Sequence, residues 1–425
     1  MKRGLVRLAM ASGAALVPGA ALAQNGATSA AIVIDPSLTR DDVAGTRTEP
    51  DLKQRPIAIG PLFGLPSLSV SGGFESNVFH RPSARSDFVA TISPGFDLRY
   101  DEGRDSAELQ GQATVRRFAR FISENSEEFA VDFRNRLELD RASAFTARAG
   151  YARLIEPRSS AGSVPDAAEP VSFGRFGAQA GLRAGLGRLS LEPEAAFERL
   201  AYSPVKLESG GVADQSFRDT RTIHGAMTIA YDFSGFSLFV QGTGDHVESV
   251  SAPADKLRDA NALSLAAGVR GTITSLLSGE LAVGYQSRDY KSPLFGDYRG
   301  ATFHADVQWF VTPLVTLRAQ ADREFRNSGN PRVAGVLASM GTLSAYYDLL
   351  RQLRLSFEGS FEVDRYRGAG TRATRKFLRG QAQYRLSRRI SLGTSLSWLR
   401  QDVRGDSLVP EFSTLRAAVG LTVTP

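Results

Sequence analysis

Apolar and polar residues alternate along most of the chain, and the pattern is clearest between Phe377 and Gln401. Small or apolar residues such as Leu378 occupy every second position, and polar residues fill the positions between them. The alternation stops at the polar stretch 387–389 and then restarts, with Leu392 on the apolar face. Because side chains on a strand point alternately to its two faces, this stretch predicts a hairpin with one apolar and one polar face.

The polar faces of the predicted strands carry charged residues far from any turn. An arginine facing lipid near the middle of a bilayer costs about 2–4 kcal/mol, so these faces must look inward if the strands cross a membrane. The alternative is a large soluble antiparallel sheet protein with one solvated face. On the membrane interpretation, Leu378, Ala382, Leu392 and Leu396 face lipid. The residues predicted to line the pore are Arg134, Arg136, Glu358, Glu362, Arg379, Gln381, Gln383 and Arg385.

Counting the alternating segments predicts about 18 strands, within a range of 16 to 20. They lie near residues 67–77, 86–100, 105–121, 126–139, 143–155, 171–184, 188–203, 216–232, 236–250, 258–272, 276–290, 297–311, 314–326, 332–348, 351–366, 371–386, 389–403 and 411–424. Short turns and longer polar loops alternate between them, as in a barrel with one periplasmic and one extracellular rim. The sequence therefore predicts an all-β fold, a transmembrane antiparallel up-and-down β-barrel with both ends of the chain on the periplasmic side.

The first residues have the form of a secretory signal peptide. A basic start at Lys2 and Arg3 precedes an apolar core and an Ala-Leu-Ala cleavage site ending at Ala23. The domain prediction is thus a signal peptide at 1–23, a periplasmic tail or plug at 24–66 and a barrel at 67–425. The chain ends in proline, whereas many outer-membrane barrels end in an aromatic residue.

Composition adds few constraints. There is no cysteine, and a formal net charge of +6 is spread over all the strands, which argues against a nucleic-acid partner. The four histidines, His80, His224, His246 and His304, form no catalytic constellation that the sequence reveals. No metal-binding or nucleotide-binding motif is present. We therefore expect neither an enzyme nor a cofactor, and no catalytic, cofactor-binding or metal-binding residue is assigned.

A family resemblance rests on the segment from Pro61 to Phe96. It contains Glu75-Ser-Asn-Val-Phe79, then Ser86-Asp87, then Ser93-Pro-Gly95. This segment resembles the start of the putative β-barrel porin type 2 family of Gram-negative outer-membrane proteins, in which the first strand ends in an Asp-Asn-x-Phe-like motif. Glu75-Ser76 departs from the acidic pair usual in that family. Many members are associated with capsule or exopolysaccharide export.

The resemblance implies an outer-membrane conduit for a capsular polysaccharide or exopolysaccharide. A passive diffusion porin for small polar solutes is the alternative, and the composition of the predicted lumen does not separate the two. The expected partners are outer-membrane lipid, the barrel assembly machinery, a periplasmic polysaccharide-export protein, and either a polysaccharide or small polar solutes. The tail at 24–54 and the loops at 156–170 and 204–215 are the candidates for blocking an idle pore.

Overall fold

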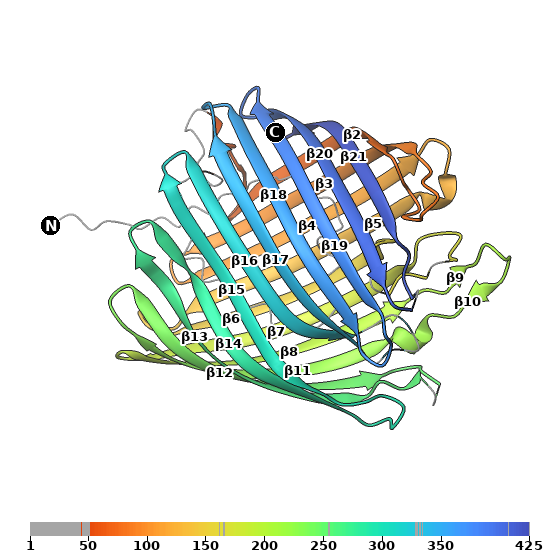
Figure 1. Cartoon of the computed structure of the whole chain (residues 1–425). Coiled ribbons are helices and arrows are strands. Elements are labelled where there is room, and N and C mark those ends of the chain that lie inside the picture. Colours follow the sequence, from red (N-terminus) through yellow and green to blue (C-terminus); the bar gives the residue numbers. More distant parts are fainter. Residues whose placement is uncertain are drawn as a thin grey trace.

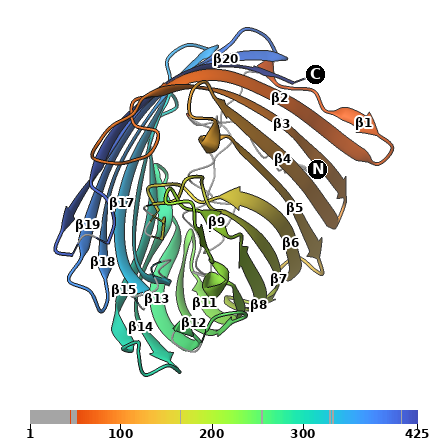
Figure 2. The same ribbon diagram turned by 90° about the vertical axis from the view of Figure 1, so that its right-hand side faces the viewer.

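The structure, a computed structural model, describes Ala44 and residues 52–424, with gaps at 161, 165, 254–255, 328–329, 331–332, 334 and 407. The predicted signal peptide and nearly all of the tail before residue 52 lie outside the described residues. Within the described part, eighteen long strands form one closed antiparallel barrel (Figures 1 and 2). Each strand pairs with the next along the chain, and β2 pairs with β21 to close the ring.

The strands that make up the wall follow the predicted segments closely. They are β2 (Leu62–Glu75), β3 (Asp87–Glu102), β4 (Asp105–Phe118), β5 (Ser126–Glu138), β6 (Ala144–Ile155), β7 (Ser172–Leu186), β8 (Leu189–Tyr202), β11 (Thr220–Asp232), β12 (Phe236–Ser249), β13 (Ala260–Thr274), β14 (Leu277–Tyr290), β15 (Tyr298–Thr312), β16 (Val315–Asn327), β17 (Gly335–Asp348), β18 (Leu353–Tyr366), β19 (Arg372–Arg385), β20 (Ile390–Arg404) and β21 (Phe412–Val423). The predicted all-β barrel of about 18 strands is confirmed.

Two predicted boundaries differ from the structure by four residues or more. The first wall strand begins at Leu62 rather than near residue 67, because Leu62 and Pro66 pair with Tyr100 and Phe96 of β3 although their stretch lacks alternation. The short strand β1 (Ile57–Ile59) folds back on its start. The eighth strand was predicted from residue 216, but Ser216–Arg218 form the 3-10 helix η4, and β11 begins at Thr220.

The two rims of the barrel differ in the length of their connections. Short turns such as 103–104 and 187–188 join the strands at one rim, which also carries the start of β2 and the end of β21. Longer connections join them at the other rim; the longest, between β8 and β11, holds β9 (Val205–Lys206), β10 (Val212–Ala213) and η4. This alternation is typical of outer-membrane barrels, whose long loops are extracellular. We call the two ends the turn rim and the loop rim.

The apolar faces of the strands point away from the interior. Val283 and Leu343 expose about 70% and 69% of their surfaces although they lie in the middle of long strands. Many other outward aliphatic and aromatic side chains are similarly exposed, which is the surface expected where lipid replaces water as the surrounding medium. No helix among the described residues is long and apolar enough to span a bilayer. Buried apolar clusters formed by loops lie at the loop rim, and a smaller one, Ala230 with Phe239 and Ala282, lies on strands nearer the turn rim.

Candidate pore and its inward-folded loops

A loop from one side of the barrel reaches the wall on the other side. The crossing loop, residues 156–171 between β6 and β7, accepts a hydrogen bond at the Ser159 carbonyl oxygen from Nη1 of Arg375, with a distance of 3.4 Å. Arg375 lies on β19, seven strands from β6 in the shorter direction around the ring. Figure 2 shows the segments around β9 within the ring of strands. The crossing loop therefore lies in the interior of the barrel near the loop rim.

Arg375 is held in the wall by carboxylates of the neighbouring strand. Its guanidinium lies 2.9 Å from Glu362 Oε1 and also bonds Asp364, and it donates to Gln401 Oε1 at 3.3 Å. Arg326 approaches the same Glu362 oxygen at 3.2 Å. Glu362, Asp364 and Gln401 are all buried, so these charge-assisted bonds hold Arg375 in a fixed position in the wall.

The base of the crossing loop is bound by a bidentate ion pair. Arg218 of η4 donates to the two carboxylate oxygens of Glu156 at 2.9 and 2.6 Å, and its guanidinium lies 3.9 Å from the centre of the Tyr202 ring. Burial alone would lower the pKa of Arg218, but the Glu156 carboxylate outweighs it and raises that pKa above its ordinary value. The crossing loop and the β8–β11 connection thus form one unit.

A second arginine of the crossing loop reaches the β4–β5 connection. Arg158 Nε donates to Glu124 at 2.9 Å, and its Nη1 donates to the Ala167 carbonyl oxygen at 2.9 Å. Burial raises the pKa of the Glu124 carboxyl, and Arg158 offsets part of that rise. Arg81, in the β2–β3 loop, also pairs with Glu208 of the β8–β11 connection at 2.8 Å. Four connections of the loop rim are therefore linked to one another by charged side chains.

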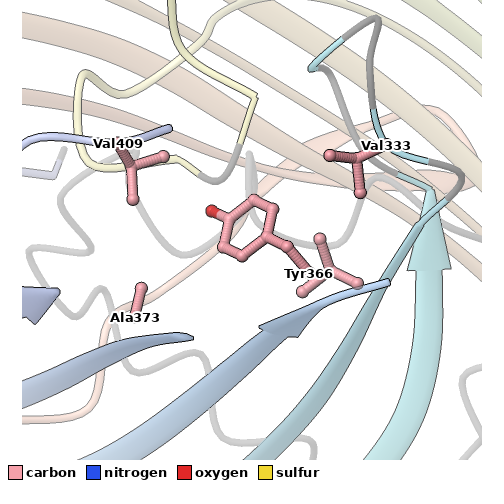
Figure 3. Packing of buried hydrophobic residues seen from close by; sticks show 5 residues of the cluster. Val333, Tyr366, Ala373 and Val409 are labelled. Atoms are coloured by element: carbon pink, nitrogen blue, oxygen red, sulfur yellow. The ribbon is translucent and has the colours of Figure 1, made fainter. Parts of the chain in front are cut away.

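A cluster of apolar side chains packs at the loop rim on the β17–β19 side of the barrel. Val333, Val336, Tyr366, Ala373 and Val409 form a buried cluster from β17, β18, β19 and two loops, and Figure 3 shows the labelled members gathered around the Tyr366 ring. Nearby, Arg258 of the β12–β13 loop donates to the Asn330 carbonyl oxygen. Burial lowers the pKa of Arg258 to about 10, and Arg258 stays charged at neutral pH.

The residues that carried the family resemblance organise the same rim. Glu75 bonds Arg416 at 2.6 Å and His80 at 3.2 Å. The Asn77 amide donates to the carbonyl oxygens of Arg81 and Ser413 at 2.7 and 3.1 Å. Asp87 accepts the backbone N–H groups of Arg120 and Phe121, at 2.9 and 2.8 Å. The motif thus holds the β2–β3 and β4–β5 loops against the seam where the barrel closes.

Comparison with known families identifies this architecture. A family model described as putative beta-barrel porin 2 matches residues 53–425. The chain belongs to this family. As a porin of this kind it resides in the outer membrane of a Gram-negative cell and forms a porin-like channel.

The chain is also similar, at low identity, to several solved structures. A mutant of the ferric enterobactin receptor PfeA from Pseudomonas aeruginosa is 9% identical, with a TM-score of 0.45, covering 85% of this chain and 80% of that one. OpdK from P. aeruginosa, solved with vanillate, is 12% identical with a TM-score of 0.45, and a BenF-like porin from Pseudomonas fluorescens is 10% identical with a TM-score of 0.46. The matches to OpdK and to the BenF-like porin each cover 85% of this chain and 99% of the other chain. No curated protein matches the porin.

The eight residues predicted to line the pore lie on the faces opposite the exposed apolar residues of their strands. On β5, Arg134 pairs with Asp132 at 2.7 Å and Arg136 approaches Glu138 at 3.9 Å. Glu358 and Arg379 are cross-strand neighbours on β18 and β19. Ser356 donates to Gln381 at 3.3 Å, and Gln383 and Arg385 continue the same face of β19 toward the turn rim. Their contact with a conducted solute stays a prediction.

Glu362 is the exception among these eight residues, because it is buried beneath Arg375 and Arg326 rather than exposed to the lumen. Arg375 itself was not singled out from the sequence. It lies between Thr374 and Lys376, just before the alternating stretch that begins at Phe377, and nothing in this polar sequence indicates that Arg375 is buried.

The histidines form pairs that the sequence did not reveal. His224 Nδ1 lies 2.6 Å from Asp245, and His304 Nδ1 lies 2.6 Å from Asp322, each pair joining adjacent strands. The strand register could have suggested both, since His224 is opposite Asp245 and His304 is opposite Asp322. The described residues contain no group of three His, Cys, Asp or Glu arranged to bind a metal ion. We interpret these pairs as cross-strand ties.

Proposed function

We propose that the porin conducts small polar solutes through an opening that the crossing loop narrows. The observation that carries this proposal is the Arg375–Ser159 hydrogen bond, which joins the loop to the far side of the wall. Barrels of 16 to 18 strands leave an aqueous channel unless something fills it. The family and the fold indicate a channel rather than an enzyme.

The charges along the inward faces support passage of solutes of either sign. Arg318 pairs with Asp306 at 2.8 Å, Arg148 pairs with Asp132 at 2.9 Å, and Arg175 pairs with Glu198 at 2.6 Å. Pairing neutralises the wall locally and leaves hydrogen-bonding groups in place. A ring of one sign would instead select ions of the other sign. We therefore expect weak charge selectivity and tolerance of neutral sugars.

Export of a capsular polysaccharide or exopolysaccharide is the second candidate. It is favoured by the family resemblance at Pro61 to Phe96 and by amides such as Gln381 and Gln383 along one strand face. The sequence placed this function first. We place it second here because the crossing loop folds inward, and passage of a polymer would require several buried ion pairs at the loop rim to separate.

Deletion of the gene separates the two functions. If the porin conducts small solutes, the deletion strain loses uptake of a small polar nutrient and keeps its surface and secreted polysaccharide. Purified porin in liposomes should then admit monosaccharides and disaccharides in a swelling assay and exclude longer oligosaccharides. Loss of the polysaccharide with unchanged uptake would reject the porin proposal in favour of export.

A further inference from the structure

On strands β6 to β21, the charged residues of the outer face are confined to the half nearer the loop rim. From β6 to β21, the outward positions in the turn-side half of each strand carry no Asp, Glu, Lys or Arg. The outward charges of these strands all lie near the loop rim, where most of them are basic. They are Arg153, Arg199, Arg221, Glu248, Asp289, Arg299, Arg323, Arg365, Arg372, Lys376, Arg400, Asp402 and Arg404. The surface facing one leaflet is thus basic, and the surface facing the other is apolar.

The basic charge is densest where three arginines lie in register on adjacent strands. Arg365 on β18 is directly opposite Arg372 on β19, and Arg372 is directly opposite Arg404 on β20. We call these three residues the arginine row. All three are exposed, and no carboxylate of the described residues forms an ion pair with them. Like charges opposite one another on neighbouring strands are destabilising unless something neutralises them.

The next outward level repeats the pattern with one carboxylate. Lys376 is opposite Arg400, and both pair with Asp402, at 3.2 and 2.8 Å. Asp402 is therefore occupied and does not neutralise the arginine row. Glu411, the nearest acidic residue along β21, accepts the backbone N–H of Val403 at 3.0 Å. The arginine row retains three uncompensated charges.

Below these basic residues the same strands are apolar. Phe361 and Leu378 expose 50% and 57% of their surfaces, and Leu396 exposes 55%. Trp398 lies at the boundary, with its indole N–H donated to Ser413 at 3.1 Å. A ligand that fits this face must carry anionic groups at one end and long apolar chains that run along the strands below. Arginine is well suited to the anionic end, because its planar fork binds phosphate oxygens in pairs.

We propose that the arginine row, with Lys376 and Arg400, is a binding site for a phosphorylated, acylated glycolipid of the outer leaflet. The phosphates lie on the three guanidinium groups, and the acyl chains lie along Phe361, Leu378 and Leu396. A second copy of the chain is a poorer occupant, because it would bring a face that is itself mostly basic. An anionic polymer in water would use the arginines but leave the apolar strip below them unused.

Binding of bisphosphorylated lipid A to the purified full-length porin tests the proposal by native mass spectrometry. The variant Arg365→Gln/Arg372→Gln/Arg404→Gln should bind it at least about tenfold more weakly than the wild type. Arg351→Gln/Arg388→Gln/Arg389→Gln removes the same charge from exposed arginines at the turn rim and should bind like the wild type. Dephosphorylated lipid A with the same acyl chains should bind the wild type weakly.

Three results would overturn the proposal. One is equal loss of lipid A binding in the two triple variants, and another is equal affinity of the wild type for phosphatidylglycerol and lipid A. The third is a dimer of the wild type that the arginine-row variant abolishes, which would assign the face to a second copy. If the arginine-row variant does not migrate as a folded barrel on an unheated gel, the test uses only the wild type and compares its binding of the two lipids. Equal binding of the phosphorylated and dephosphorylated lipids then rejects the site.

Discussion

Arg375 shows how one residue can connect the wall of this barrel to a loop in its interior. A buried arginine is stable only when its charge is paired and its N–H groups are bonded. The carboxylates of Glu362 and Asp364 neutralise the guanidinium of Arg375. The side-chain oxygen of Gln401 and the carbonyl oxygen of Ser159 accept further hydrogen bonds from its N–H groups. Removing one partner of such a buried pair leaves the others uncompensated, at a cost of about 3–5 kcal/mol.

Replacing Arg375 should therefore both destabilise the loop rim and free the crossing loop. We expect Arg375→Gln to raise the mean single-channel conductance in planar bilayers and to add current fluctuations. The midpoint of thermal unfolding of the loop-rim region should also fall. Arg379→Gln is the matched control, because Arg379 lies four residues away on the same face of β19 and bonds no loop residue in the described part of the chain. Equal effects of the two variants would show that the bond to Ser159 does not restrain the loop.

The role of Arg375 could not be predicted from the sequence, and the reason is physical. Alternation shows only which face of a strand a residue occupies, and Arg375 and Arg379 occupy the same face. The contact with Ser159 spans 216 positions of the chain and depends on how a polar loop folds inside a closed ring. By contrast, the outward position of Leu378 followed from period two alone. The sequence pattern was therefore a reliable guide to the positions and faces of the strands, but it gave no information on the contacts that the loops make.

At the scale of the element, β19 gives the sharpest test of which face meets water. Its register with β18 and β20 places Leu378 opposite Gly359 and Trp398, and Gln381 opposite Ser356 and Ser395. From Leu378 to Arg385 the outward face is apolar or small and the inward face is polar, whereas nearer the loop rim the outward face carries Arg372 and Lys376. A shift of one residue would reverse both faces. This is why the strand pattern could be read from the sequence, whereas the start of β2, where Leu62 to Pro66 do not alternate, could not.

Single cysteines introduced into β19 should distinguish its faces. Gln381→Cys and Gln383→Cys should react with a membrane-impermeant thiol reagent added to whole cells, because the polar face opens to the lumen. Leu378→Cys and Ala382→Cys should be protected by lipid. The chain contains no native cysteine, so any labelling reports on the introduced residue. The opposite pattern would mean that the barrel is inverted relative to the predicted lumen.

At the scale of the whole molecule, the question is which segment restricts the pore. The crossing loop, the β8–β11 connection and the tail at 24–54 were the three candidates from the sequence. The first two are joined to each other by Arg218 and Glu156 and to the far wall by Arg375. Of this tail, only Ala44 and residues 52–54 are described, so its role stays a prediction.

Two deletions compare the loop with the tail. Replacing residues 157–170 by a short Gly-Ser turn keeps Glu156 and its pair with Arg218 but removes the segment that reaches Arg375. We expect this variant to conduct several-fold more current and to sensitise cells to large antibiotics, because the interior of an eighteen-strand barrel is otherwise wide enough to hold water. Removing residues 24–51 after the signal peptide should change conductance much less. If the tail deletion opens the pore and the loop deletion does not, the tail is the plug, and the crossing loop only braces the rim.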